Sequence, residues 1–312
     1  MSSFINKVFK NKKSRNSLIL AQDSNPDGLG HDTKTLEKIS TEVSTNQSPI
    51  KNDLEIPQLT VGVGQSIGVQ RDHNEDSLFT LTTNLVTGNK NILFGLFIIA
   101  DGMGGHENGD VASSLAVDTL TLHVFNSFYL PQISHTRNQS DFSIQEIMLS
   151  GVIQAHQTIK SKASGSGTTL TSALIFGNLL TIAHIGDSRA YLMNSDGILQ
   201  LLTHDHSLVK RLEEIGQISQ EQALTHPQRN YLYRALGQGE PGEPDIATYQ
   251  LQPGSKLLLC SDGLWGVISD KKMETMIKSS AEPQQVCQAL INYANAAGGP
   301  DNISVIIVQI AE

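Results

Sequence analysis

Residues 98–102 of the sequence read IIADG, and residues 257–263 read LLLCSDG. In both segments an apolar run that is typical of a buried strand leads into an aspartate, Asp101 or Asp262, and then a glycine. A carboxylate that leaves an apolar strand is costly to bury alone, so we expect it to be paired or bound to a cation. The glycine removes side-chain bulk and lets the backbone carbonyl face an ion as well. These segments therefore predict a cation site at the ends of strands.

Three further acidic segments support a metal site. They are RDHNED at residues 71–76, GDSR at 186–189 and GGPDN at 298–302. Hard cations such as Mg²⁺ and Mn²⁺ take oxygen ligands, so dispersed carboxylates with few histidines between them suit these ions and suit zinc poorly. A single Asp-Gly step is also an ordinary turn signal. The joint pattern, and no single segment, favours the metal site over separate turns.

The order of apolar patterns after Leu59 favours an α+β fold. Helical patterns come in pairs between blocks of strands, which favours mostly antiparallel sheets covered by helices over a doubly wound parallel sheet. Ser195-Asp196-Gly197 predicts a hairpin turn between two short strands. The predicted strands are 59–69, 77–82, 92–100, 168–176, 179–186, 188–193, 198–202, 245–250, 256–261 and 302–310, and the predicted helices are 110–129, 143–162, 207–215, 270–278 and 283–296.

Composition excludes several classes of function. The net charge of −9 over 312 residues argues against nucleic acid as the main partner, because backbone-phosphate binding needs clustered Lys and Arg. The longest apolar run, 92–100, suits a buried strand and is too short for a transmembrane segment. The basic N-terminus is not followed by an apolar stretch of signal-peptide length. Two cysteines without metal-ligand spacing are typical of a reducing cytoplasm, where we expect the protein.

Residues 1–57 differ in composition from the rest and predict a largely disordered polar tail ahead of one domain at 58–312. The first fifteen residues are basic, with apolar residues between the charges. They suit either a short helix on an anionic membrane or partner, or a solvated tail. The tail threonines (Thr33, Thr35, Thr41 and Thr45) are either phosphorylation sites or linker residues.

Eight segments together resemble the signature motifs of bacterial metal-dependent protein serine/threonine phosphatases of type 2C, the PPM family. The resemblance covers about residues 60 to 310. It implies a four-layer α-β-β-α sandwich of two mostly antiparallel sheets flanked by helix pairs, with a flap at about 205–228. The segments are RDHNED at 71–76, DGMGG at 101–105, SGTTL at 166–170, HIGDSR at 184–189, LTHDHS at 202–207, HPQR at 226–229, SDG at 261–263 and PDN at 300–302.

The resemblance also implies roles for the acidic residues. Asp101 would bridge two metal ions, Mn²⁺ or Mg²⁺, and Asp262 with Asp301 would complete one of the two sites. The carbonyl of Gly102 would help to hold the other ion. The family's reaction is direct attack of a metal-bridging water or hydroxide on phosphoserine or phosphothreonine, without a phosphoenzyme.

Four further residues take expected roles from the same motifs. Glu75 and Asp76 would lie near the second ion, with waters between. Asp187 matches a position that holds a third, weaker ion together with Asp262. Arg71 would bind the substrate phosphate, which suits the bidentate geometry of guanidinium.

One departure leaves the general acid open. Many eukaryotic members carry a histidine directly after the Asp-Gly pair, where this sequence has Met103. Either His106, three residues further on, or a metal-bound water would then protonate the leaving group. His204, His206 and His226, near the flap, are expected to be structural or substrate-contacting, since no helical His-x-x-x-His pair is present.

The implied partners are phosphorylated proteins and a cognate serine/threonine kinase, in a signalling role, with the phosphatase a monomer. Two alternatives remain at this stage. One is a catalytically weak sensor or scaffold that keeps the fold, although Asp101, Asp262 and Asp301 are all present. The other is a hydrolase of small phosphorylated molecules.

Overall fold

A computed structural model describes residues 58–87, 90–103, 108–134, 142–240, 242–280 and 282–311. The predicted tail, residues 1–57, and the candidate general acid His106 lie outside the described residues. The four layers and the cleft considered below are all formed by the described part of the chain. Within it, none of the helices combines the length and the apolar character needed to cross a bilayer.

Two antiparallel sheets form the centre of the domain. The first has the order β1-β11-β10-β7-β8, and the second has the order β2-β3-β5-β6-β9 with β4 paired to β3. The first contains β1 (Leu59–Ser66), β7 (Arg189–Met193), β8 (Leu199–Leu201), β10 (Lys256–Cys260) and β11 (Ile303–Ile310), and the second contains β2 (Asp76–Thr87), β3 (Lys90–Met103), β4 (Gly167–Thr168), β5 (Leu170–Phe176), β6 (Leu179–Ile185) and β9 (Asp245–Gln250).

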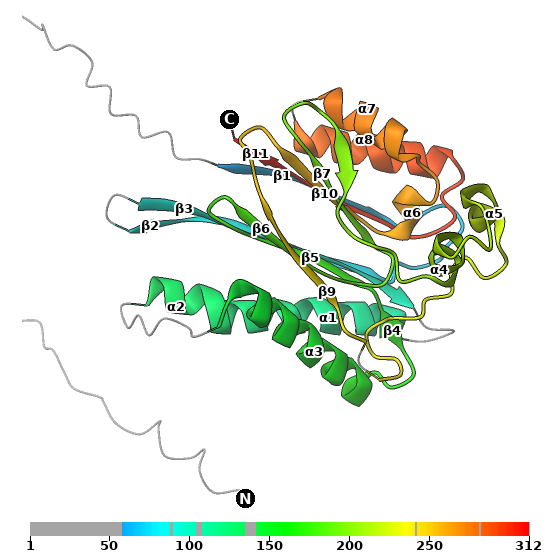
Figure 1. Cartoon of the computed structure of the whole chain (residues 1–312), viewed down its shortest axis with the longest axis horizontal. Helices are drawn as coiled ribbons and strands as arrows, with labels where there is room; N and C mark the ends of the chain where they lie inside the picture. The colour runs from blue at the N-terminus through cyan, green and yellow to red at the C-terminus, as the bar shows by residue number, and fades with distance from the viewer. Residues whose placement is uncertain are drawn as a thin grey trace, which may run out of the picture. The chain divides into compact units, whose positions relative to one another are not determined.

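Helices cover the outer face of each sheet (Figure 1). Helices α1 (Gly109–Val124) and α3 (Ile144–Lys162) pack on the second sheet, and α7 (Asp270–Lys278) and α8 (Pro283–Ala296) pack on the first. The predicted α-β-β-α sandwich is therefore confirmed.

Strand β3 shows why the sequence requires helices on one face and a sheet on the other. Leu96 and Ile98 pack with α1 and α3, whereas Phe97 and Ile99 pack against the first sheet. Successive side chains of a strand point to opposite faces, so an uninterrupted apolar run is buried on both sides. All four side chains are fully buried.

The predicted elements match those observed, with differences of a few residues at most ends. The turn at Gly197 joins β7 to β8 with a positive φ of 78°, as the hairpin prediction requires. Strand β2 is longer than predicted because its polar second half still pairs with β3. The patterns did not predict α2 (Leu130–Ile133), α5 (Gln220–Thr225) or α6 (Asp262–Trp265), which are too short to show a period, and a π-helix (Phe125–Tyr129) ends the first predicted helix.

The predicted flap lies in the segment that connects β8 of the first sheet to β9 of the second. It contains α4 (Leu208–Glu214) and α5, and an isolated bridge between Ser207 and Leu232 closes its base. Ser207 caps α4 by accepting a hydrogen bond from the Lys210 amide, and Ser219 begins α5 with a capping box.

Candidate active site

Carboxylates from both sheets line one cleft. Asp76 and Asp101 lie directly opposite each other where β2 begins and β3 ends. Asp262 opens α6 just after β10, and Asp301 lies just before β11. The turn between β6 and β7 carries Asp187. The structure thus brings together the five aspartates that the sequence singled out.

The cleft is small and strongly acidic. It has a volume of about 210 Å³, and the residues around it come from segments far apart in the chain. Its lining consists of Arg71, Glu75, Asp101, Gly102, Met103, Thr169, Asp187, Asn230, Leu232, Asp262 and Asp301.

Burial makes the charged state of these carboxylates unfavourable. Desolvation, followed by the charges of neighbouring aspartates, raises the pKa of Asp76 to about 7 and that of Asp262 to about 6. The same causes, burial first, raise the pKa of Asp101 and Asp187 well above the usual aspartate range. A bound cation would remove both penalties.

Two buried oxygens, one on a residue that lines the cleft and one on the buried neighbour of Asp101, have no hydrogen-bond partner. They are Oδ1 of Asp76 and Oδ1 of Asp262. Buried polar atoms are nearly always paired, so an unpaired one requires an explanation such as an ion or a water. The ligand atoms here are oxygens, which suits a hard divalent cation. The residues present therefore fit the metal that the sequence motifs imply.

Gly102 lies where no side chain would fit. A Cβ at this position would come within 2.2 Å of the Gly109 carbonyl oxygen and 2.6 Å of the Glu75 carbonyl oxygen. The Gly102 amide donates to that Glu75 carbonyl at 3.2 Å. Glu75 and Gly102 are thus held side by side at the cleft, and the Glu75 carboxylate lies against Gly109.

Arg71 reaches the cleft from the loop that follows β1. Its Nη2 is 2.6 Å from Oδ2 of Asp301, and 45% of its side chain is exposed. The partner's charge and hydrogen bond raise the pKa of Arg71 despite the opposing effect of desolvation. A guanidinium that borders the acidic cleft yet stays accessible is placed to receive an anion.

Two residues that the sequence analysis gave no role organise the cleft. The side-chain amide of Asn302 donates to the carbonyls of Ile67 and His73 at 2.8 and 2.9 Å, and its Oδ1 accepts from the Glu75 amide at 2.9 Å. Ser261 donates to Asp76 Oδ2 at 2.9 Å. Both sit beside a predicted ligand, in the SDG and PDN motifs, and that adjacency was the available signal.

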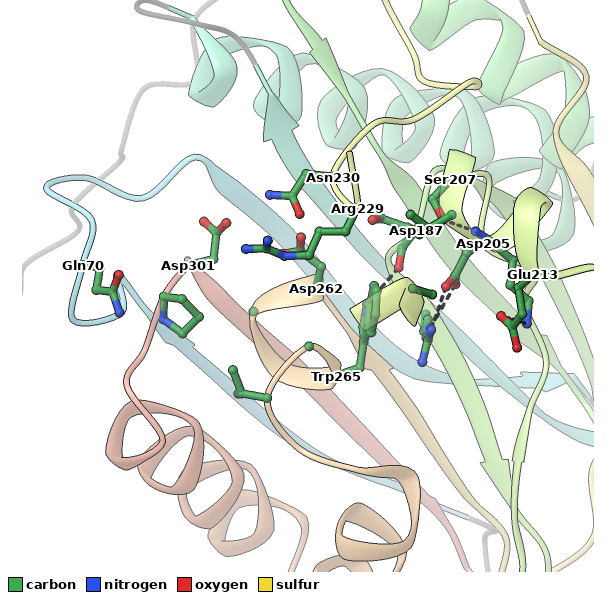
Figure 2. Close-up of a pocket in the computed structure, with 18 of the residues that line it drawn as sticks. Gln70, Asp187, Asp205, Ser207, Glu213, Arg229, Asn230, Asp262, Trp265 and Asp301 are labelled. Carbon is green, nitrogen blue, oxygen red and sulfur yellow. Dashed lines mark hydrogen bonds and ion pairs between the residues drawn. The ribbon is translucent and has the colours of Figure 1, made fainter. Parts of the chain in front are cut away.

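A stacked group lies next to the Asp187 turn. The indole N–H of Trp265 donates to the Asp187 carbonyl at 2.9 Å, and the Arg189 guanidinium lies 3.7 Å over the Trp265 ring. Arg189 also donates twice to Asp205, at 2.9 and 2.6 Å. Figure 2 shows Asp205 at the base of the flap, beside Asp187 and Trp265.

A larger pocket of about 390 Å³ continues from the cleft towards the flap. Arg71, Asp187, Asn230, Asp262 and Asp301 line both spaces. Arg229 and Asn230, at the end of the flap, lie over Asp262 in Figure 2. Arg229 belongs to the predicted HPQR motif, but the sequence analysis assigned it no role.

The two cysteines offer no nucleophile at this site. Cys260 and Cys287 are free and buried, and neither lines the cleft or the pocket. Burial raises the pKa of both thiols, so neither is expected to form a thiolate near neutral pH.

Comparisons with known proteins agree with this geometry. The family model described as Protein phosphatase 2C matches residues 61–303. The serine/threonine phosphatase stp of Listeria innocua is 39% identical over 214 residues, which cover 69% of this chain and 84% of the relative. The protein phosphatase PhpP of Streptococcus pneumoniae is 37% identical over 218 residues, which cover 70% and 86%.

Solved structures give the same result. The serine/threonine phosphatase PstP/Ppp of Mycobacterium tuberculosis superposes with a TM-score of 0.68 at 32% identity, over 82% of this chain and 100% of that one. A PstP catalytic domain in complex with two manganese ions superposes with a TM-score of 0.67 at 30% identity, over 82% of this chain and 100% of that one.

The chain belongs to the protein phosphatase 2C family. It is a metal-dependent protein serine/threonine phosphatase that acts on phosphorylated proteins. The relatives are named as phosphatases, so the alternative of a scaffold without turnover gains no support from them.

Proposed function

We propose that the aspartate cleft binds two divalent ions, Mn²⁺ or Mg²⁺, and that Arg71 binds the phosphate of a phosphoserine or phosphothreonine. The observation that carries the proposal is the set of buried, partly unpaired carboxylate oxygens beside an accessible guanidinium. The manganese ions named for the PstP domain support the count and the type of metal.

In this proposal Asp101 would serve both ions, and Asp262 with Asp301 would complete the ligands of one of them. The Gly102 carbonyl serves the other site, with Glu75 and Asp76 nearby. When bound, such ions stabilise charge on phosphoryl oxygens and lower the pKa of the attacking water.

Arg71 and Asp187 have supporting roles. Arg71 orients the phosphate through paired N–H donors. To do this, the guanidinium gives up its hydrogen bond to Asp301. Asp187, whose carbonyl accepts a hydrogen bond from Trp265, would hold a third and weaker ion together with Asp262. His106 or a bound water donates the proton to the leaving alkoxide.

The proposal extends to the cellular setting of the enzyme. We place the enzyme in the cytoplasm as a monomer, in a signalling role opposite a serine/threonine kinase. The domain is residues 58–312, with the flap at 205–228 bordering the substrate and residues 1–57 forming a separate tail.

Hydrolysis of a phosphothreonine peptide tests the proposal. We expect turnover that requires Mn²⁺ or Mg²⁺, stops in excess EDTA, and falls by about 10²–10³-fold or more in Asp262→Asn, the range for removing a preorganised electrostatic group. Asp196→Asn, in the exposed turn after β7, is the control and should keep wild-type activity. Full turnover in excess EDTA would contradict the metal mechanism.

The general acid is tested separately. If His106 donates the proton, His106→Ala should lose the basic limb of the pH–rate profile while Mn²⁺ binding stays unchanged. An unaltered profile would assign that step to a water.

A further inference from the structure

A second group of ligand-type side chains lies outside the lining of the aspartate cleft. Among the described residues, one ligand atom from each of His204, His206 and Asp245 lies within 4.8 Å of the others. Glu214 of α4 contacts the Nε2 of His204 directly. These residues join the segment after β8, the first flap helix and the start of β9.

The spacing differs from the helical histidine pair considered in the sequence analysis. His204 and His206 are two residues apart in a segment that is not helical, and their ring centroids are 6.2 Å apart. The Nε2 of His206 is 3.2 Å from Oδ2 of Asp245. Ligands of a tetrahedral zinc site lie about 3.3–3.5 Å apart, given bonds of about 2.0–2.1 Å, so small side-chain shifts would complete the set.

We propose that His204, His206 and Asp245, with Glu214 beside them, form a binding site for Zn²⁺ at the base of the flap. Imidazole and carboxylate together are typical zinc ligands, whereas the aspartate cleft offers only oxygens. The His204 side chain is 43% exposed and that of Asp245 is 48% exposed, which gives the ion a path from solvent.

His184 holds the segment in place without being a ligand itself. Its Nε2 lies 3.0 Å from the carbonyl oxygen of His204, and its Nδ1 faces the Thr171 hydroxyl at 2.9 Å. The His184 ring also packs against His206, with centroids 5.0 Å apart. The backbone at His204 is therefore fixed while its imidazole remains accessible.

Arg234 occupies the position next to the proposed ion. Its Nη1 lies 3.4 Å from His206 Nε2, 3.5 Å from Asp245 Oδ1 and 3.4 Å from the Glu243 carbonyl. All three are long contacts, and 37% of the side chain is exposed. The guanidinium competes with a cation and must move away when the ion binds.

Binding at His206 is coupled to the Asp187 turn. The Gly186 amide donates to Nδ1 of His206 at 3.1 Å, so the neutral ring carries its proton on Nε2, facing Asp245. Coordination through Nε2 moves that proton to Nδ1, with no net proton release, and breaks the Gly186 hydrogen bond. Zn²⁺ at the flap base therefore disturbs the residue that precedes Asp187.

Zinc titration of the full chain tests the site. Zn²⁺ affinity is measured by competition with a chromophoric chelator, in an excess of Mg²⁺ that competes for the aspartate cleft and in the Asp101→Asn background. We expect one Zn²⁺ per chain that His204→Gln or Asp245→Asn weakens by about tenfold or more. Arg234→Gln should instead bind Zn²⁺ more tightly, because the competing cation is gone.

The control is His123→Gln, whose histidine lies on α1 and bonds to Ser150 and Gln154 of α3. It should bind Zn²⁺ as the wild type does. Equal Zn²⁺ affinity in His204→Gln and His123→Gln would overturn the proposal, and so would weaker binding in Arg234→Gln.

Two further measurements separate this site from the catalytic one. Asp101→Asn should keep the zinc site, even though its phosphatase activity is lost. In the wild type the backbone amide resonance of Gly186 should shift when Zn²⁺ is added, and it should not shift in His204→Gln. Zn²⁺ binding without that shift would refute the coupling to the Asp187 turn.

Discussion

The aspartate cleft and the base of the flap adjoin each other but treat buried charge in opposite ways. In and beside the cleft, carboxylates face other carboxylates, and two buried oxygens, Oδ1 of Asp262 and Oδ1 of Asp76, have no partner. At the base of the flap, Asp205 is buried too, but Arg189 donates to both of its oxygens. In the first region one cation, Arg71 at Asp301, faces several carboxylates, so compensation is partial. In the second region the buried carboxylate has a full partner.

The difference indicates that one region serves ligand binding and the other serves stability. A buried charge that a protein neutralises itself contributes to holding elements together, whereas one left uncompensated destabilises the fold until a ligand arrives. Sites of function commonly carry such a cost in stability. Substitutions, metal and pH that change the charge in either region test this contrast.

Asp101→Asn should give the largest effect, with opposite signs for activity and stability. We expect phosphatase activity to fall by about 10³-fold or more, as removal of a preorganised electrostatic group does. The metal-free variant should nevertheless unfold at a higher temperature than the metal-free wild type, because it no longer buries a carboxylate whose ionised form is disfavoured by desolvation and by neighbouring aspartates. Thermal unfolding in EDTA measures this, with the exposed Asp118→Asn as control. A lower melting temperature would mean that the cleft is not under electrostatic strain.

Arg189→Met should have the opposite effect on stability. The aliphatic part of the side chain is kept, but Asp205, whose side chain is 5% exposed, loses its partner. Breaking a buried pair in this way costs about 3–5 kcal/mol of unfolding free energy. Denaturant unfolding should show that loss.

The matched comparison is Lys278→Ala, which breaks an exposed pair with Glu274 one helical turn away. There we expect a change of about 1 kcal/mol or less. If Arg189→Met and Lys278→Ala lower the unfolding free energy equally, the Arg189–Asp205 pair contributes no more than a surface ion pair.

Mn²⁺ should stabilise the wild type because it binds the folded cleft and not the unfolded chain. At a free concentration about 100 times the dissociation constant, one site contributes about 2.7 kcal/mol. The melting temperature should therefore rise with Mn²⁺ and return to its starting value after EDTA. In Asp101→Asn the rise should be smaller, and an equal rise would place the stabilising ion elsewhere.

The smallest effect concerns pH at the base of the flap. Burial lowers the pKa of His184 to about 4, well below the value near 6.5 of an unfolded histidine. As the pH falls, the unfolded chain binds the proton first, so stability is lost progressively between about pH 6.5 and 4.

Urea unfolding of the wild type and of His184→Gln at pH 7, 6 and 5 measures this loss. The stability difference between the two proteins should shrink by about 1–2 kcal/mol from pH 7 to pH 5. A difference that stays constant with pH would show that His184 does not carry the effect.

Elements with a strong period were predictable from the sequence. The apolar run of β3 and the Asp-Gly steps after β3 and β10 lie where the patterns put them, and the predicted aspartates meet at one cleft. The strand and the Asp-Gly steps depend on local sequence, whereas the meeting of the aspartates was expected from the joint pattern of segments and the family resemblance. The roles of the individual aspartates were read from family motifs and remain proposals.

Other features depend on contacts between segments far apart in the chain. The Asn302 side chain bonds to both ends of the loop between β1 and β2, more than 220 residues away in sequence, and the indole of Trp265 reaches back to Asp187. The hydrophobic periodicity of a segment does not indicate which distant residues its side chains will contact. Helix α6 was missed for a related reason, since its Asp262-Gly263 start has the composition of a turn.

The position of β11 has a consequence for how the protein is made. This strand is the last in sequence, yet it lies between β1 and β10 and pairs with both. While the ribosome is still translating the preceding residues, the nascent chain carries two unpaired strand edges and lacks Asp301. We therefore expect the first sheet and the complete metal cleft to form only after β11 has left the ribosomal exit tunnel, and a chain stalled before that point to be open to chaperones and proteases.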